Sequence, residues 1–173
     1  MVDNGDGTVS DPSTCLTWQK EPKESVNWHN ARNYCEHNLG DLPGSGWVLP
    51  PIDGLRSLVR DCSSTMSGGS CAISSPDCLD WQCYYQSDDS CEGCDWDINC
   101  YWDGVFGQAC DRGAWSKSTC SDGPSKAWTL RYSDARIDDE IKTDSSDSNN
   151  TPIAVRCMKS AICLPRDDSV CFD

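Results

Sequence analysis

The chain has 173 residues and a formal net charge of −14, and leucine, isoleucine, valine and phenylalanine together make up about 15% of it. This composition is typical of disordered proteins, but 14 cysteines and 8 tryptophans supply disulfides and large buried side chains that oppose disorder. No apolar run is long enough to span a membrane, and an acidic chain is a poor ligand for nucleic acids or other polyanions. We therefore expect one ordered, disulfide-stabilised globular domain over residues 1–173, with no membrane insertion and no nucleic-acid partner.

The cysteines are abundant and even in number, which indicates an oxidising compartment and predicts a secreted or cell-surface protein. Asp3, Asn4 and Asp6 follow Met1 closely, which is unlike a signal peptide, so we expect the signal to have been removed.

The first 60 residues carry the clearest periodic patterns. A turn-rich start followed by Val9 and by residues 16–19 predicts an N-terminal hairpin. Residues 25–39 have apolar side chains at helical spacing and predict a helix, and residues 46–50 predict a short buried strand. Residues 52–59 predict a second helix. The buried faces of the two helices are expected to be formed by Trp28, Ala31, Tyr34 or Cys35, and Leu39 in the first, and by Ile52, Leu55, Leu58 and Val59 in the second.

Residues 61–113 hold eight cysteines and many aromatic residues but almost no periodic aliphatic pattern. We interpret this stretch as a long irregular loop insertion that its own disulfides hold together, although the sequence cannot give their pairing. Beyond it, residues 114–116, 127–132, 136–138 and 153–158 predict strands, and residues 160–173 form a cysteine-containing tail. Five tryptophans lie in periodic segments and are expected in the core: Trp18, Trp28, Trp47, Trp115 and Trp128.

No pattern marks a catalytic site, so we expect a protein that is not an enzyme and that requires no cofactor. The two histidines, His29 and His37, both fall in the predicted helix, and nothing places a nucleophile beside them. The spacing of Cys91, Cys94 and Cys100 suits zinc, but disulfides are the favoured interpretation in an oxidising compartment. Asp95, Asp97 and Asn99 alternate as calcium ligands do, which makes calcium possible, and a solvated acidic loop is the alternative.

The aromatic residues of the loop region are the preferred ligand-binding surface, because tryptophan and tyrosine stack on sugar rings and anchor protein interfaces. The alternative is that they pack over the disulfides as a small core, and we expect two or three of them to be exposed. The candidates are Trp81, Tyr84, Tyr85, Trp96, Tyr101 and Trp102.

Several segments together resemble one family pattern in one order. They are Asp3-Asn4-Gly5-Asp6-Gly7-Thr8-Val9 with Leu16 and Trp18-Gln19-Lys20, Trp28 with Ala31 and Tyr34-Cys35, Trp47-x-Leu49-Pro50 with Leu55 and Leu58, Ala127-Trp128, and Val155-Arg156-Cys157. The set resembles the Lcl C-terminal domain family of bacterial surface proteins, over roughly 100 residues in two blocks around the cysteine-rich stretch.

The resemblance implies an α+β, C-type-lectin-like fold related to the formylglycine-generating enzyme group, with short antiparallel strands, one or two helices and a long loop region. It also implies a disulfide between Cys35 and Cys157, since lectin-like folds join the first helix to the last strand. Cys163 with Cys171 is a second expected pair. Cys15 and Cys120 depart from the family pattern, and we expect them to pair with each other.

In the founding member of the family, the domain is a trimeric adhesin head that binds glycosaminoglycans. A chain of charge −14 should repel sulfated polysaccharides, so that ligand is not expected here. The resemblance implies a homo-oligomer, with a trimer favoured, that binds a carbohydrate or a surface protein through the loops of residues 61–113. The alternative is a structural subunit of an extracellular fibre, in which those aromatic side chains make subunit contacts.

Overall fold

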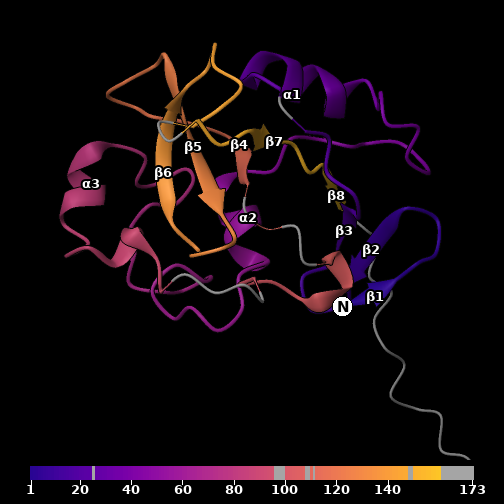
Figure 1. Cartoon of the computed structure of the whole chain (residues 1–173), viewed down its shortest axis with the longest axis horizontal. Coiled ribbons are helices and arrows are strands. Elements are labelled where there is room, and N and C mark those ends of the chain that lie inside the picture. The colour runs from indigo at the N-terminus through magenta and orange to yellow at the C-terminus, as the bar shows by residue number, and fades with distance from the viewer. Residues whose placement is uncertain (25, 96–99, 108–109, 111, 148–149, 161–173) are drawn as a thin grey trace, which may run out of the picture.

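The computed structural model describes residues 1–24, 26–95, 100–107, 110, 112–147 and 150–160. The strands of this part are β1 (Val2–Asp3), β2 (Thr8–Asp11), β3 (Leu16–Gln19), β4 (Gly113–Thr119), β5 (Lys126–Arg131), β6 (Ile137–Ile141), β7 (Ile153–Ala154) and β8 (Met158–Ser160). Its helices are α1 (Trp28–Glu36), α2 (Ile52–Ser57) and α3 (Trp81–Tyr85), with short 3-10 turns η1 (Ser90–Glu92) and η2 (Gly104–Phe106). The strands form two sheets, of order β1-β2-β3-β8 and β6-β5-β4-β7 (Figure 1).

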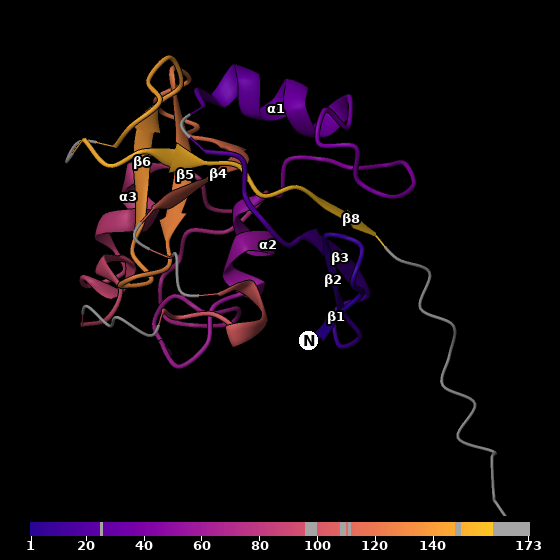
Figure 2. The same ribbon diagram turned by 45° about the vertical axis from the view of Figure 1, so that its right-hand side comes forward.

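The predicted N-terminal hairpin is confirmed. Strands β2 and β3 pair antiparallel, with Val9 opposite Trp18, and both side chains are fully buried. The segment predicted as one final strand is instead divided between the two sheets. Strand β7 runs parallel to β4, the chain then bridges to Lys23 at Val155, and β8 pairs antiparallel with β3. Residues 153–160 therefore join the two sheets (Figure 2).

Helix α1 is shorter than predicted. Asn27 caps it by accepting a hydrogen bond from the Asn30 N–H, and the helix ends at Glu36. Its predicted buried face is confirmed for Trp28, Ala31 and Cys35, but Leu39 is 57% exposed and that part of the prediction is wrong. The reason is that Asn38 has a positive φ of 48°, which turns the chain away before residue 39 can reach the core.

The second sheet is covered on both faces. Trp128, Leu130 and Ile137 face α2 and the cysteine-rich stretch, whereas Trp115 and Ala127 pack in a second cluster with α1. Figures 1 and 2 both show α1 running along the top of this sheet, with α3 beside β6. Helix α2 is confirmed, with all four expected side chains buried, and so is the burial of the five expected core tryptophans.

Disulfides hold the long stretch of residues 61–113, which contains only α3, η1 and η2 as helical elements among its described residues. All eight of its cysteines pair within the stretch, as expected. The predicted bond between Cys35 and Cys157 is also confirmed, with an S–S distance of 2.05 Å. The four bonds of the stretch are Cys62–Cys94, Cys71–Cys91, Cys78–Cys83 and Cys100–Cys110.

The expected Cys15–Cys120 bond is wrong. Cys15 is disulfide-bonded, but Cys120 is a buried free thiol whose Sγ donates a hydrogen bond to Oδ2 of Asp139 at 3.4 Å. Burial raises the pKa of the Cys120 thiol, with the Asp139 carboxylate adding to the effect. Cys163 and Cys171 lie outside the described residues.

No helix in the described part of the chain is long and apolar enough to cross a bilayer.

Candidate functional site

Some of the aromatic side chains predicted to bind a ligand are buried in the structure, and others are exposed. Tyr84 and Trp102 are each 8% exposed, so they pack inside the molecule and do not offer a face to a ligand. Trp81 and Tyr101 are partly buried, and Tyr85, at 72%, is the exposed aromatic residue of the described set. Trp96 lies outside the described residues.

The described aromatic candidates form two separate groups. Trp102 packs against Tyr132, with ring centroids 4.7 Å apart, and the Tyr101 hydroxyl donates to the carbonyl oxygen of Asp95 at 2.7 Å. Trp81, on the other hand, lies in α3 and packs against Tyr84 and Tyr85, whose ring centroids are 5.0 and 5.3 Å from its own. The group of Trp81, Tyr84 and Tyr85 faces β6. Because Tyr85 is exposed, this group is the better candidate for a ligand-binding surface.

The expected calcium loop is only partly described. Asp95 is exposed, and Asp97 and Asn99 lie outside the described residues. Among the residues that are described, no three His, Cys, Asp or Glu side chains converge as a metal site. The cysteines of the zinc-like pattern belong to three different disulfides, so the disulfide interpretation is confirmed for Cys91, Cys94 and Cys100.

Asp139 of β6 fixes the position of Trp81. Its side chain is 2% exposed and accepts hydrogen bonds from the Trp81 indole N–H at 3.0 Å and from Lys126 Nζ at 3.1 Å. The Lys126 ammonium also lies 5.6 Å from the centre of the Trp81 ring. Because a buried carboxylate accepts from the indole N–H and a cation lies over the ring, the orientation of Trp81 is fixed.

A groove with Trp81 as one wall runs along β6, the edge strand of the second sheet, and has a volume of about 370 Å³. We call it the β6 groove. It has one ammonium group and five carboxylates, so its lining is strongly acidic. The residues that line it are Trp81, Lys126, Asp138, Asp139, Glu140, Ile141, Asp144, Ser146 and Asp147.

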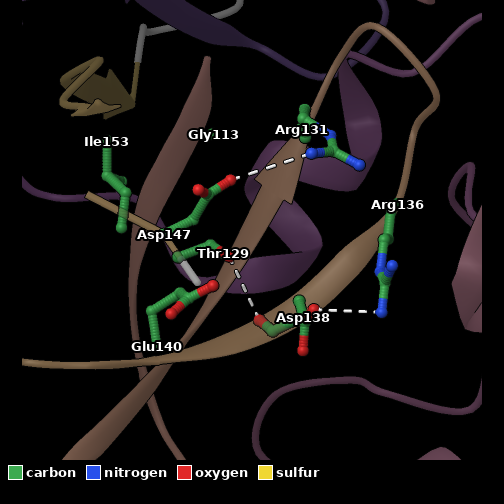
Figure 3. A pocket seen from close by; sticks show the side chains of 8 residues that line it. All are labelled: Gly113, Thr129, Arg131, Arg136, Asp138, Glu140, Asp147 and Ile153. Atoms are coloured by element: carbon green, nitrogen blue, oxygen red, sulfur yellow. Dashed lines mark hydrogen bonds and ion pairs between the residues drawn. The ribbon is translucent and has the colours of Figure 1, made fainter. Parts of the chain in front are cut away.

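A second, smaller hollow adjoins the groove and shares Asp138, Glu140 and Asp147 with it. Two of these acids, Asp138 and Glu140, alternate along β6 with Ile137 and Asp139 and therefore point to the opposite face of the sheet, whereas Asp147 comes from the loop that follows β6. Figure 3 shows Arg131 and Arg136 on one side of this hollow and the carboxylates of Glu140 and Asp147 on the other.

The two arginines that line this hollow form ion pairs with acidic side chains. Arg131 forms an ion pair with Asp134 and lies 3.7 Å from Asp147, while Arg136 lies 3.2 Å from Asp138. Burial raises the pKa of Asp138, and the neighbouring carboxylates raise it further, although Arg136 opposes this. Carboxylates that are crowded in this way accept hydrogen bonds readily and favour a ligand rich in hydroxyl or amino groups.

The sequence pattern predicts Trp81 and Tyr85 as ligand-binding residues but does not predict the acidic wall of this groove, since residues 136–138 are predicted only as a strand. The run Asp138-Asp139-Glu140 was the available signal, since three consecutive acids on a strand place carboxylates on both faces of a sheet edge.

Comparison with known proteins gives one result for the family. The model of the Lcl C-terminal domain matches residues 7–159, a span that includes the second sheet, strands β2 and β3 of the first, the cysteine-rich stretch and the β6 groove. No curated protein and no solved structure matches the chain. Since the match covers most of the sequence, the chain belongs to the Lcl C-terminal domain family.

Proposed function

We propose that the chain is a secreted or surface-displayed binding module, an adhesin head that recognises a carbohydrate through the β6 groove. The observation that carries the proposal is the fixed, partly exposed Trp81 ring beside exposed Tyr85, at the wall of a groove lined by carboxylates. Aromatic rings stack on the apolar faces of sugars, and carboxylates accept hydrogen bonds from their hydroxyls. The disulfides agree with an extracellular setting.

The charge of the groove defines the kind of carbohydrate. The five carboxylates outnumber Lys126 and the two arginines that pair with them, Arg131 and Arg136, which disfavours sulfated or carboxylated glycans and favours neutral or amino-bearing ones. A C-type-lectin-like arrangement and a trimer remain part of the proposal. Support for the fold comes from the Cys35–Cys157 bond between α1 and the segment before β8, together with the long loop region beside the sheet.

The alternative of a fibre subunit has less support. It requires the loop aromatic side chains to be available for contacts between chains, but Tyr84 and Trp102 are buried within one chain. We therefore propose binding, without catalysis, as the role of this surface.

A glycan array tests the proposal, with neutral, amino-bearing and sulfated glycans probed in the presence and absence of calcium. We expect neutral or amino-bearing glycans to bind and sulfated ones to be silent. Trp81→Ala and Tyr85→Ala should each weaken binding by about tenfold or more, as loss of an interface anchor does. The control is Leu39→Ala, which removes an exposed apolar side chain that follows the end of α1 and does not line the groove, and it should leave binding unchanged.

Two outcomes would overturn the carbohydrate proposal. One is equal binding by the Trp81→Ala, Tyr85→Ala and Leu39→Ala variants, which would move the site away from the groove. The other is silence on every glycan together with a polymer in a mass measurement of the assembled protein, which would favour the fibre subunit.

A further inference from the structure

Arg156 is a buried cation at the junction of the two sheets. It is 1% exposed, and its guanidinium group lies 4.8 Å from the centre of the Trp102 ring and 4.3 Å from that of Phe106. Its Nη1 donates to the backbone carbonyl oxygens of Gln19, at 2.7 Å, and of Lys20. Arg156 therefore ties the segment between β7 and β8 to the end of β3.

Arg156 forms no ion pair in the described part of the chain, and the Glu21 carboxylate favours its charge only from a longer distance. None of the ion pairs found there includes it, and its Nη2 is buried without a hydrogen-bond partner. Burial lowers the pKa of Arg156 to about 10, which still leaves the group protonated at neutral pH. A buried charge without an ion pair and a buried donor without a hydrogen bond are both destabilising, which is why such groups normally have partners.

A small cavity adjoins this guanidinium. Trp102 and Tyr132 form aromatic walls, Pro22 lies at its border, and a second guanidinium, that of Arg112, lines it as well. Arg112 is partly exposed and forms an ion pair with Glu24, whose side chain is 55% exposed. The free space has room for one water molecule or one monatomic ion, and a polyatomic anion such as phosphate is too large for it.

We propose that this cavity binds a single halide ion, chloride under natural conditions, between the guanidinium groups of Arg156 and Arg112. A water molecule would satisfy one N–H of Arg156 but would leave its charge without an ion-pair partner in contact, in a region of low dielectric constant. A monovalent anion satisfies the donor and neutralises the charge together. The two arginines make the local field attractive for an anion even though the whole chain is strongly acidic.

The bound ion has a structural consequence. Arg156 reaches the Gln19–Lys20 end of β3 in one sheet, while the cavity is bordered by Ala114 of β4 and Ala154 of β7 in the other. Halide binding should therefore stabilise the junction between the two sheets. The site does not depend on the β6 groove, so its test is independent of the proposed function.

Thermal unfolding of the whole chain tests the proposal. Sodium chloride or sodium bromide replaces sodium gluconate at constant ionic strength, which removes the general effect of salt on a highly charged protein. We expect the Tm to rise with halide and to level off at millimolar concentration, since an ion that binds only the folded state stabilises that state by mass action. Crystals soaked in bromide should give one anomalous peak at hydrogen-bond distance from Arg156 Nη2.

Two variants separate the site from general charge effects. Arg112→Gln removes one ligand at the partly exposed side and should weaken halide binding by roughly tenfold, the effect of losing one charge-assisted hydrogen bond. The control is Arg32→Gln, which has the same change of charge and also loses an exposed ion pair, with Glu36. It should keep the full halide response. Equal Tm values in all three salts, a water without anomalous signal at Nη2, or equal responses of the two variants would overturn the proposal.

Discussion

At the scale of single residues, Asp138 shows how burial and charge compete in the β6 groove. Its carboxylate accepts a hydrogen bond from the Asp139 N–H and lies 3.2 Å from Arg136, and both contacts favour the ionised form. Burial opposes them and dominates, so the pKa of Asp138 is raised. A carboxylate with a raised pKa in the folded state binds protons more tightly there than in the unfolded chain.

The first prediction concerns the variant Asp138→Asn. The raised pKa means that ionised Asp138 costs stability, and this cost appears as the pH rises from the unfolded pKa through the folded one. Asp138→Asn should therefore stabilise the protein at pH 7 by about 1 kcal/mol or less, with the gain vanishing at a pH below both pKa values. Urea unfolding at several pH values measures the difference.

The control for this prediction is Asp144→Asn, which neutralises an exposed carboxylate of the same groove. It should change the free energy of unfolding by less than Asp138→Asn at pH 7. If Asp138→Asn instead destabilises the protein at pH 7, then the ion pair with Arg136 outweighs the burial of the carboxylate.

At the scale of elements, the disulfides act over very different lengths of chain. Cys35–Cys157 closes 122 residues and joins α1 to the segment between β7 and β8. Cys78–Cys83 closes only 5 residues next to α3. Since a disulfide restricts the unfolded chain more when its loop is longer, the two bonds should differ in their contribution to stability.

The second prediction compares the double variants Cys35→Ala/Cys157→Ala and Cys78→Ala/Cys83→Ala. The first should lose about 5 kcal/mol and the second about 2 kcal/mol by the loop-entropy relation. Thermal and urea unfolding of both variants under non-reducing conditions give the two values. A larger loss from the short loop would mean that local packing around α3, and not chain entropy, determines what these bonds contribute.

At the scale of the whole molecule, the net charge of −14 governs the encounter with charged partners. Arginine and lysine side chains that form ion pairs are partly neutralised, as at Arg131, Arg136 and Lys126 around the β6 groove. The long-range field is therefore repulsive for polyanions, and it is screened beyond about 8 Å at physiological salt.

The third prediction follows from this field. The chain should pass through a heparin column without retention at about 0.15 M salt, because its net charge of −14 repels a sulfated polymer. A basic protein of similar size serves as the positive control. Retention that is abolished by added salt would show a local basic site strong enough to overcome the net charge.

The sequence by itself determined the disulfide-rich character, the N-terminal hairpin, both main helices, the buried tryptophans, the Cys35–Cys157 bond and the family. These features depend on local periodicity or on an ordered set of motifs, which a single chain displays directly. The tertiary structure decided the division of residues 153–160 between two sheets, the free thiol of Cys120 and the exposure of Leu39. It also decided that Trp81, rather than the whole aromatic stretch, meets the acids of β6. Each of these depends on which distant segments become neighbours, because burial and pairing are properties of contacts across the fold and not of spacing along the chain.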